Sequence, residues 1–104
     1  MKNYIKLTGP NSKNPTYGRK IYNQAIYKEF RHCMNTLDTL SRENSSGKKF
    51  FTAKLVKDRF KGFCKEIMED FRTKYKSSED NNRLNDEIME KSTILDNLIA
   101  VKML

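Results

Sequence analysis

Apolar residues recur at steps of three and four along two long segments of the chain. In the first segment, about residues 19–43, they are Ile21, Ala25, Ile26, Phe30, Cys33, Met34, Leu37 and Leu40. In the second, about residues 50–76, they are Phe51, Leu55, Phe60, Phe63, Cys64, Ile67, Met68, Phe71 and Tyr75. This spacing places the apolar side chains on one face of an α-helix, so each segment predicts an amphipathic helix. The polar residues 44–49 between the two segments predict a turn.

A third helix is predicted over about residues 78–103. The sequence Ser77-Ser78-Glu79-Asp80 has the form of a helix start, because a hydroxyl accepts from first-turn amides and the acids suit the positive helix end. The apolar residues that follow are Leu84, Ile88, Leu95, Leu98, Ile99 and Met103. Amphipathic helices joined by short turns bury their apolar faces against one another. The pattern therefore predicts an all-α, antiparallel three-helix bundle over residues 19–104.

Residues 1–18 are predicted to form an extended basic arm in front of this bundle. Gly9-Pro10-Asn11, Asn14-Pro15 and Tyr17-Gly18 each favour non-helical backbone. The whole chain has a net charge of +8, and its first acidic residue is Glu29. A basic start without acids is typical of a mitochondrial import signal, and equally of a solvated tail that lies on an acidic partner.

Composition and motifs narrow the classes of function. No run approaches the ~18 consecutive apolar residues of a membrane-spanning helix. Cys33 and Cys64 lie far apart without a CxxC companion, which argues against zinc and predicts two reduced cysteines in the core. The chain contains no HExxH, GxSxG, Walker or GxGxxG motif. We therefore expect a protein that is not an enzyme and has no metal or cofactor of its own.

The polar face of the first predicted helix is basic. Lys20, Tyr27, Lys28 and Arg31 share one sector of that helix, because their spacing follows the helical repeat. Positive charges around an aromatic side chain suit the surface of an acidic partner. A charged helix face that meets only solvent has the same pattern, so the residues alone leave both interpretations open.

The segment Ala25 to Arg31, which reads AIYKEFR, resembles the signature of the LYR-motif family of small mitochondrial proteins. In that family a Leu-Tyr-Arg on the first of three helices is followed, late in the second, by a Phe-Arg pair and a short polar stretch with an acid. Here Ile26-Tyr27-Lys28 corresponds to the tripeptide and Phe71-Arg72 to the pair. A third helix with spaced leucines follows in the same order. The resemblance covers about residues 19–100.

The resemblance implies an adaptor that docks the mitochondrial acyl carrier protein. The acidic surface of the carrier would meet the first helix, and its acyl-4′-phosphopantetheine would enter the bundle between the helices. Ile26 is the first residue of the motif. Tyr27 and Lys28, which follow it, would flank the entry and the phosphate, and Arg31 would extend the contact with the acidic surface of the carrier. Phe71-Arg72 would line the mouth from the second helix. Lysine in place of arginine at position 28 offers a point charge where a guanidinium offers a planar fork.

The resemblance also implies neighbours in a larger assembly. A basic arm that lies across other subunits favours an accessory subunit of a mitochondrial respiratory-chain complex, such as complex I, on the matrix side of the inner membrane. One alternative is an RNA-contacting or assembly protein of the mitochondrial ribosome, with the arm on the RNA. Others are a partner in iron–sulfur cluster assembly and a structural bundle whose basic face is only solvated.

Overall fold

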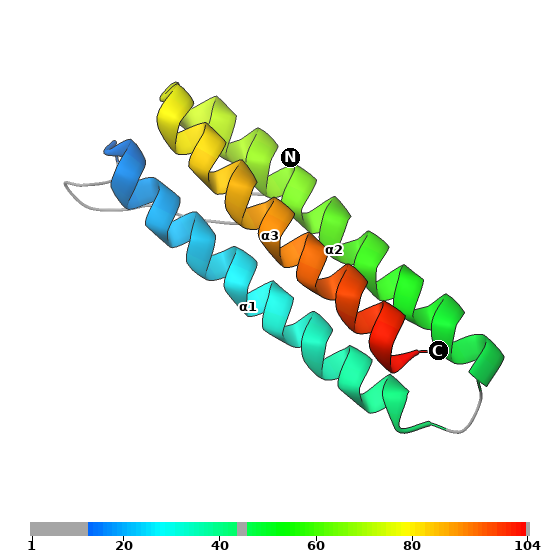
Figure 1. The fold of residues 1–104 in the computed structure, drawn as a ribbon. Helices are drawn as coiled ribbons and strands as arrows, with labels where there is room; N and C mark the ends of the chain where they lie inside the picture. Colours follow the sequence, from blue (N-terminus) through cyan, green and yellow to red (C-terminus); the bar gives the residue numbers. More distant parts are fainter. Residues whose placement is uncertain (1–12, 44–45, 104) are drawn as a thin grey trace.

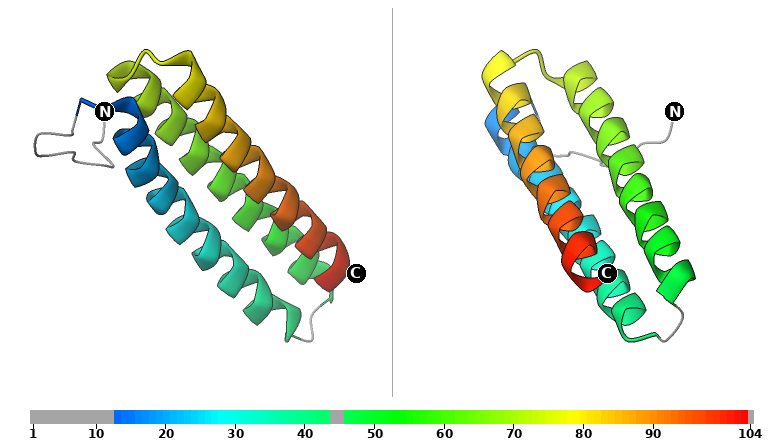
Figure 2. Two further views of the ribbon diagram at one scale, coloured as in Figure 1. Left: turned by 60° about the vertical axis from the view of Figure 1, so that its left-hand side comes forward. Right: turned by 45° about the vertical axis from the view of Figure 1, so that its right-hand side comes forward.

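The computed structural model describes residues 13–43 and 46–103, which form three helices packed side by side (Figure 1). The helices are α1 (Pro15–Ser41), α2 (Ser46–Lys74) and α3 (Ser78–Lys102). Successive helices run in opposite directions, and each packs against the other two (Figure 2). The predicted all-α, antiparallel three-helix bundle is confirmed. Residues 1–12 of the predicted arm lie outside the described residues.

α1 begins at Pro15, four residues earlier than predicted, so residues 15–18 belong to the bundle and not to the arm. The Asn14 side chain accepts hydrogen bonds from the backbone N–H groups of Thr16 and Tyr17, at 2.9 and 3.2 Å. These bonds satisfy amides that have no partner inside the helix, and Pro15 has the backbone angle that a first helical residue needs. The Asn-Pro pair that predicted a turn is therefore the start of the helix.

The bounds of α2 also differ from the prediction, at both ends. Residues 46–49, predicted as part of the turn, are helical, and the Lys49 ammonium donates to the Ser41 carbonyl at the end of α1 (3.2 Å). At the other end α2 stops at Lys74, two residues early, because Ser77 must leave helical geometry to cap α3. The Ser77 hydroxyl accepts from the backbone N–H of Asp80 (3.3 Å), so the predicted start of α3 is confirmed.

The core lies along the axis of the bundle and takes side chains from each helix. Its fully buried large members are Tyr22, Phe60, Phe71, Ile26, Leu37, Ile67, Leu84 and Leu95. The prediction that Phe51 and Leu55 lie on the buried face of α2 is wrong, because Phe51 is 65% exposed and Leu55 is 47% exposed. Ala53 is the buried residue between them, and residues two apart on a helix point about 200° away from each other.

The predicted state of the cysteines is confirmed, since Cys33 and Cys64 are both buried and unpaired. Burial raises the pKa of the Cys33 thiol to about 11. Burial also raises the pKa of the Cys64 thiol, to about 12. Both side chains are thus neutral near pH 7 and pack as small apolar groups.

Gly18 of α1 and Gly62 of α2 respond differently to an added methyl group. A Cβ on Gly18 would lie 2.5 Å from Cζ of Tyr75, whereas a Cβ on Gly62 would meet no atom within 4 Å. We expect Gly62→Ala to raise the free energy of unfolding by about 0.5–1 kcal/mol through helix propensity. We expect Gly18→Ala to lower the free energy of unfolding by about 1–2 kcal/mol, because the Tyr75 ring is buried and also packs against Phe71. Urea denaturation measures both shifts, and a stabilising Gly18→Ala would contradict this packing.

Candidate functional site

The exposed face of α1 carries an uncompensated positive surface, here called the α1 stripe and formed by Lys20, Tyr27, Lys28 and Arg31. All four side chains are exposed, and Tyr27 retains 51% of its accessible surface. The Arg31 guanidinium lies 5.9 Å from the centre of the Tyr27 ring, in a cation–π contact. Among the described residues, the three basic members of the stripe form no ion pair. Their charge is therefore available to an acidic partner.

The buried face of α1 fixes the direction in which the stripe points. Tyr22, Ile26 and Phe30 are buried on the side opposite to it, against α2 and α3. The Phe30 ring meets Phe60 edge-on at 6.2 Å between centroids. Because these contacts prevent rotation of α1 about its own axis, the stripe is presented on a rigid support.

The structure separates the residues that the LYR resemblance groups together. Tyr27, Lys28 and Arg31 lie together at the surface of α1, but Ile26 is 1% exposed and belongs to the core. Phe71 is 0% exposed in the core of the bundle. Arg72 is exposed, and it faces a groove between α2 and α3. Phe71 packs edge-on against Tyr22, which is on the buried face of α1, whereas the α1 stripe is exposed.

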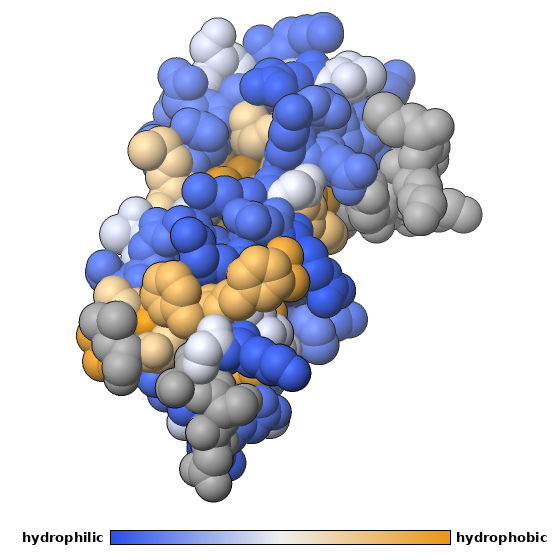
Figure 3. Space-filling model, turned by 90° about the vertical axis from the view of Figure 1, so that its right-hand side faces the viewer, coloured by the Kyte–Doolittle hydropathy of each residue, from blue (hydrophilic) through white to orange (hydrophobic). Residues whose placement is uncertain are grey.

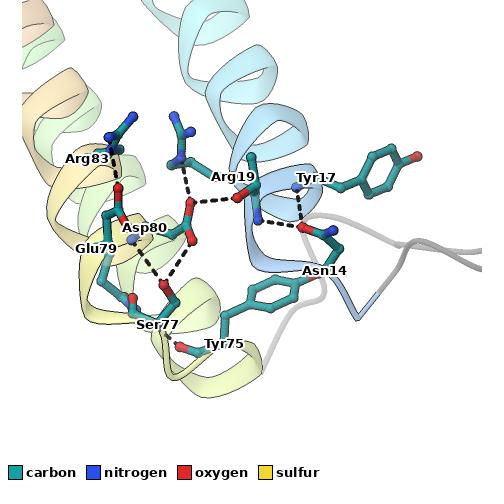
Figure 4. Close-up of polar contacts among 10 residues, drawn as sticks. Asn14, Tyr17, Arg19, Tyr75, Ser77, Glu79, Asp80 and Arg83 are labelled. Carbon is teal, nitrogen blue, oxygen red and sulfur yellow. Dashed lines mark hydrogen bonds and ion pairs between the residues drawn. The ribbon is translucent and has the colours of Figure 1, made fainter.

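A buried carboxylate holds the first turns of α1 and α3 together, next to the start of the stripe (Figure 4). Asp80 accepts hydrogen bonds from Arg19 Nε at 2.9 Å, from the Ser77 hydroxyl at 2.9 Å and from the Thr16 hydroxyl at 3.4 Å. Burial by itself raises the pKa of Asp80, but these donors and the Arg19 charge outweigh burial and hold the pKa below its usual value. We call these four residues the Asp80 clamp.

A second buried carboxylate joins α1 to α2. The Tyr22 hydroxyl donates to Asp70 at 2.5 Å, and the Lys74 ammonium lies 3.2 Å from the same carboxylate. Burial, followed by the neighbouring Asp70, raises the pKa of the Tyr22 phenol far above its ordinary value. The phenol therefore stays protonated and acts as a hydrogen-bond donor in the core.

The described residues line grooves of different sizes. One lies between α2 and α3, has a volume of about 270 Å³ and is lined by Lys61, Cys64, Lys65, Met68, Arg72, Asn85, Ile88 and Ser92. A wider one, of about 380 Å³, lies where α2 turns into α3 and is lined by Arg72, Tyr75, Lys76, Ser78, Asn81 and Asn82. A much smaller one lies between α1 and α2 near the stripe, has a volume of about 20 Å³ and is lined by Glu29, His32, Cys33, Thr36, Val56 and Arg59. Sequence reasoning missed the 270 Å³ groove except for Arg72. The basic residues at positions 61, 65 and 72, which flank Cys64 and Met68 at helical spacing, were the available signal.

Neither a metal-binding cluster nor a membrane-spanning helix is found in the described part of the chain. No group of three His, Cys, Asp or Glu side chains there is arranged to hold a metal ion. None of the three helices in residues 13–43 and 46–103 is long and apolar enough to cross a membrane. Comparison of the chain with protein-family models, with curated proteins and with solved structures found no match.

Proposed function

We infer that this protein is a non-catalytic adaptor of the LYR type, which docks an acyl carrier protein on the α1 stripe. The observation that carries this function is the rigid, exposed stripe with its unpaired cations. It coincides with the Tyr27 and Lys28 positions of the motif, and a three-helix bundle presents it. In keeping with the motif and the net charge of +8, we place the adaptor as an accessory subunit of a mitochondrial respiratory-chain complex, on the matrix side of the inner membrane.

The charges of the stripe and the acyl chain of the carrier have different roles in this function. An exposed ion pair contributes only about 0–1 kcal/mol, so the stripe mainly speeds and orients the encounter with an acidic surface. Burial of roughly eight to ten methylenes at about 0.8 kcal/mol each gives on the order of 6–8 kcal/mol. The acyl chain should therefore dominate affinity. Acyl-4′-phosphopantetheine belongs to the carrier, and the adaptor contributes the stripe and an apolar interior.

The acyl chain cannot enter beside the stripe without moving core side chains. The groove between α1 and α2 offers about 20 Å³, roughly the space of a single water molecule. Entry there requires α1 and α2 to part. Met34, which is partly buried on α1 and packs against the core, is flexible enough to yield part of that space. We therefore expect binding of an acylated carrier to be slower than binding of the carrier without its acyl group.

Replacement of two stripe residues tests the docking surface. Tyr27→Ala with Lys28→Glu removes the exposed ring and reverses one charge, and we expect the dissociation constant for an acylated mitochondrial carrier protein to rise about 30- to 100-fold, that is by about 2–3 kcal/mol. Isothermal titration calorimetry measures it. The matched control is Phe51→Ala with Lys48→Glu, which also removes an exposed aromatic ring and reverses one lysine charge, on α2. The control should leave carrier binding unchanged.

Purification from the source mitochondria tests the assignment to an assembly. Intact-mass spectrometry of the tagged protein and its companions should reveal a small acidic protein with a phosphopantetheine-linked acyl group, together with respiratory-chain subunits. If Tyr27→Ala with Lys28→Glu bound the carrier as tightly as its control on α2, the assignment of the docking surface to the α1 stripe would be overturned. Recovery of ribosomal proteins without an acylated carrier would overturn the adaptor function in favour of an RNA-contacting protein.

A further inference from the structure

The first turns of α2 expose three large apolar side chains, here called the α2 patch and formed by Phe50, Phe51 and Leu55. Phe51 and Leu55 point to solvent one helical turn apart, and Phe50 beside them is partly exposed. Figure 3 shows apolar side chains gathered on this end of the bundle, with hydrophilic side chains above them. Scattered single apolar residues are ordinary at protein surfaces, but a cluster of two aromatic rings and a leucine marks an interaction surface.

The helix that carries the patch is strongly basic. Residues 46–65 contain six lysines, one arginine and a single acid, Asp58. The Lys54 ammonium lies 5.7 Å from the centre of the Phe50 ring, and Lys48, Lys54, Lys61 and Lys65 form no ion pair among the described residues. The α2 patch thus lies within a surface of unpaired lysines.

This charge disfavours a second copy of the chain as the occupant. Two copies that met through the patch would bring Lys48 and Lys54 of each close to the lysines of the other. Like charges placed at an interface weaken association. The net charge of +8 on each chain acts in the same direction.

The kind of basic residue distinguishes between a protein and a lipid surface. Specific protein interfaces are enriched in arginine and depleted in lysine, and they seat protruding side chains in matching hollows. The cations around the α2 patch are mostly lysines, whose long stems let the ammonium reach a charged layer while the apolar groups go deeper. Phenylalanine and leucine beside lysines on one helix are typical of segments that lie in the interface of an anionic bilayer.

We propose that the α2 patch docks the protein on the surface of an anionic phospholipid bilayer, with Phe51 and Leu55 entering the headgroup region and Lys48 and Lys54 binding the lipid phosphates. This contact is peripheral and leaves the bundle intact. The α1 stripe lies on a different helix, so the membrane contact uses none of the stripe residues. The membrane contact does not depend on the adaptor function.

Sedimentation with vesicles tests the contact on the full chain. We expect binding to vesicles of phosphatidylcholine and phosphatidylglycerol in a two-to-one ratio, and at least about tenfold weaker binding to phosphatidylcholine alone. Phe51→Ser with Leu55→Ser should weaken binding to the mixed vesicles at least about tenfold. Met89→Ser with Val101→Ser makes the same kind of change at two exposed positions of α3 and should leave binding unchanged.

A charge-matched pair separates a specific face from the net charge of the molecule. One double variant, Lys48→Gln with Lys54→Gln, removes two positive charges from α2. The other, Lys20→Gln with Lys28→Gln, removes two positive charges from the α1 stripe. We expect only the α2 pair to weaken binding strongly. The chain contains no tryptophan, so Phe51→Trp supplies a single fluorescent reporter. Its emission should shift to the blue on the mixed vesicles and be quenched by lipids brominated in their acyl chains.

Three results would overturn the proposal. Equal losses in the two lysine pairs would show that bulk charge, not the patch, attracts the vesicles. Binding that is unaffected by Phe51→Ser with Leu55→Ser would exclude the apolar contact. The patch would be assigned to a second copy of the chain if the protein did not bind vesicles but self-associated in analytical ultracentrifugation, and if Phe51→Ser with Leu55→Ser abolished that self-association.

Discussion

Phe71→Ala should lower the free energy of unfolding by about 3–5 kcal/mol, the largest effect of a single substitution that we expect in this protein. The Phe71 ring is fully buried, lies 5.2 Å from the Tyr22 ring edge-on and 4.9 Å from the Tyr75 ring, centroid to centroid. Its removal leaves a cavity between α1 and α2 and also deprives two buried tyrosines of an aromatic neighbour. Urea denaturation followed by circular dichroism measures the loss.

Phe51→Ala is the matched control for this prediction, because it makes the same change on the same helix at an exposed position. We expect it to alter the free energy of unfolding by no more than about 0.5 kcal/mol. Equal losses from the two substitutions would contradict the assignment of the buried face of α2. Phe71→Ala also tests the LYR resemblance, which implies that Phe71 lines the mouth of the acyl site. If Phe71 acts only through the fold, carrier binding per folded molecule stays at the wild-type value in Phe71→Ala.

Asp80→Ala should lower the free energy of unfolding by about 2–4 kcal/mol, because it removes the acceptor at the centre of the Asp80 clamp. Arg19 would then keep a partly buried charge without its carboxylate partner. The adjacent Glu79→Ala is the control. Glu79 pairs with Arg83 at the surface (2.8 Å), and we expect that loss to be about 0–1 kcal/mol. If Asp80→Ala lowered the free energy of unfolding no more than Glu79→Ala does, the clamp would not hold α1 to α3.

The clamp should also make stability depend on pH in a definite direction. The folded-state pKa of Asp80 is lowered, so the unfolded state takes up its proton first as the pH falls. The contribution of Asp80 is therefore fully present above its unfolded pKa of about 3.9. It is lost progressively as the pH falls from there through the lower folded pKa. The difference between wild type and Asp80→Ala should narrow in this range, and a constant difference from neutral to acid pH would contradict the ionised clamp.

The helices were predictable because their signals are local. Apolar spacing indicated three helices, and Ser77 with two following acids marked the start of α3 correctly. The α1 start was missed although Asn14-Pro15 contained its signal, since the same dipeptide also favours turns. The positive stripe was predictable for the same reason. The four residues span a sector of about 100° around the helix, and they share it whatever the helix packs against.

Packing decided which of several apolar positions on α2 became core. Phe50, Phe51, Ala53, Leu55 and Val56 cover more of the helix circumference than one bundle can bury, and the periodicity of the sequence does not rank them. Packing against α1 and α3 buries Ala53 and Val56 and leaves the α2 patch exposed. The same choice placed Phe71 in the core and Arg72 in the groove, although the two are neighbours in the chain.

The amino-acid pattern thus specified the helices, their order and the basic face of α1, because each depends on residues within a few turns of one another. The tertiary structure specified the Asp80 clamp, the Tyr22–Asp70 bond, the grooves and the exposed patch. Arg19 and Asp80 are 61 residues apart, and Tyr22 and Asp70 are 48 residues apart. Such pairs form only when the rotation and register of whole helices are set, and these are consequences of how all three buried faces fill one core.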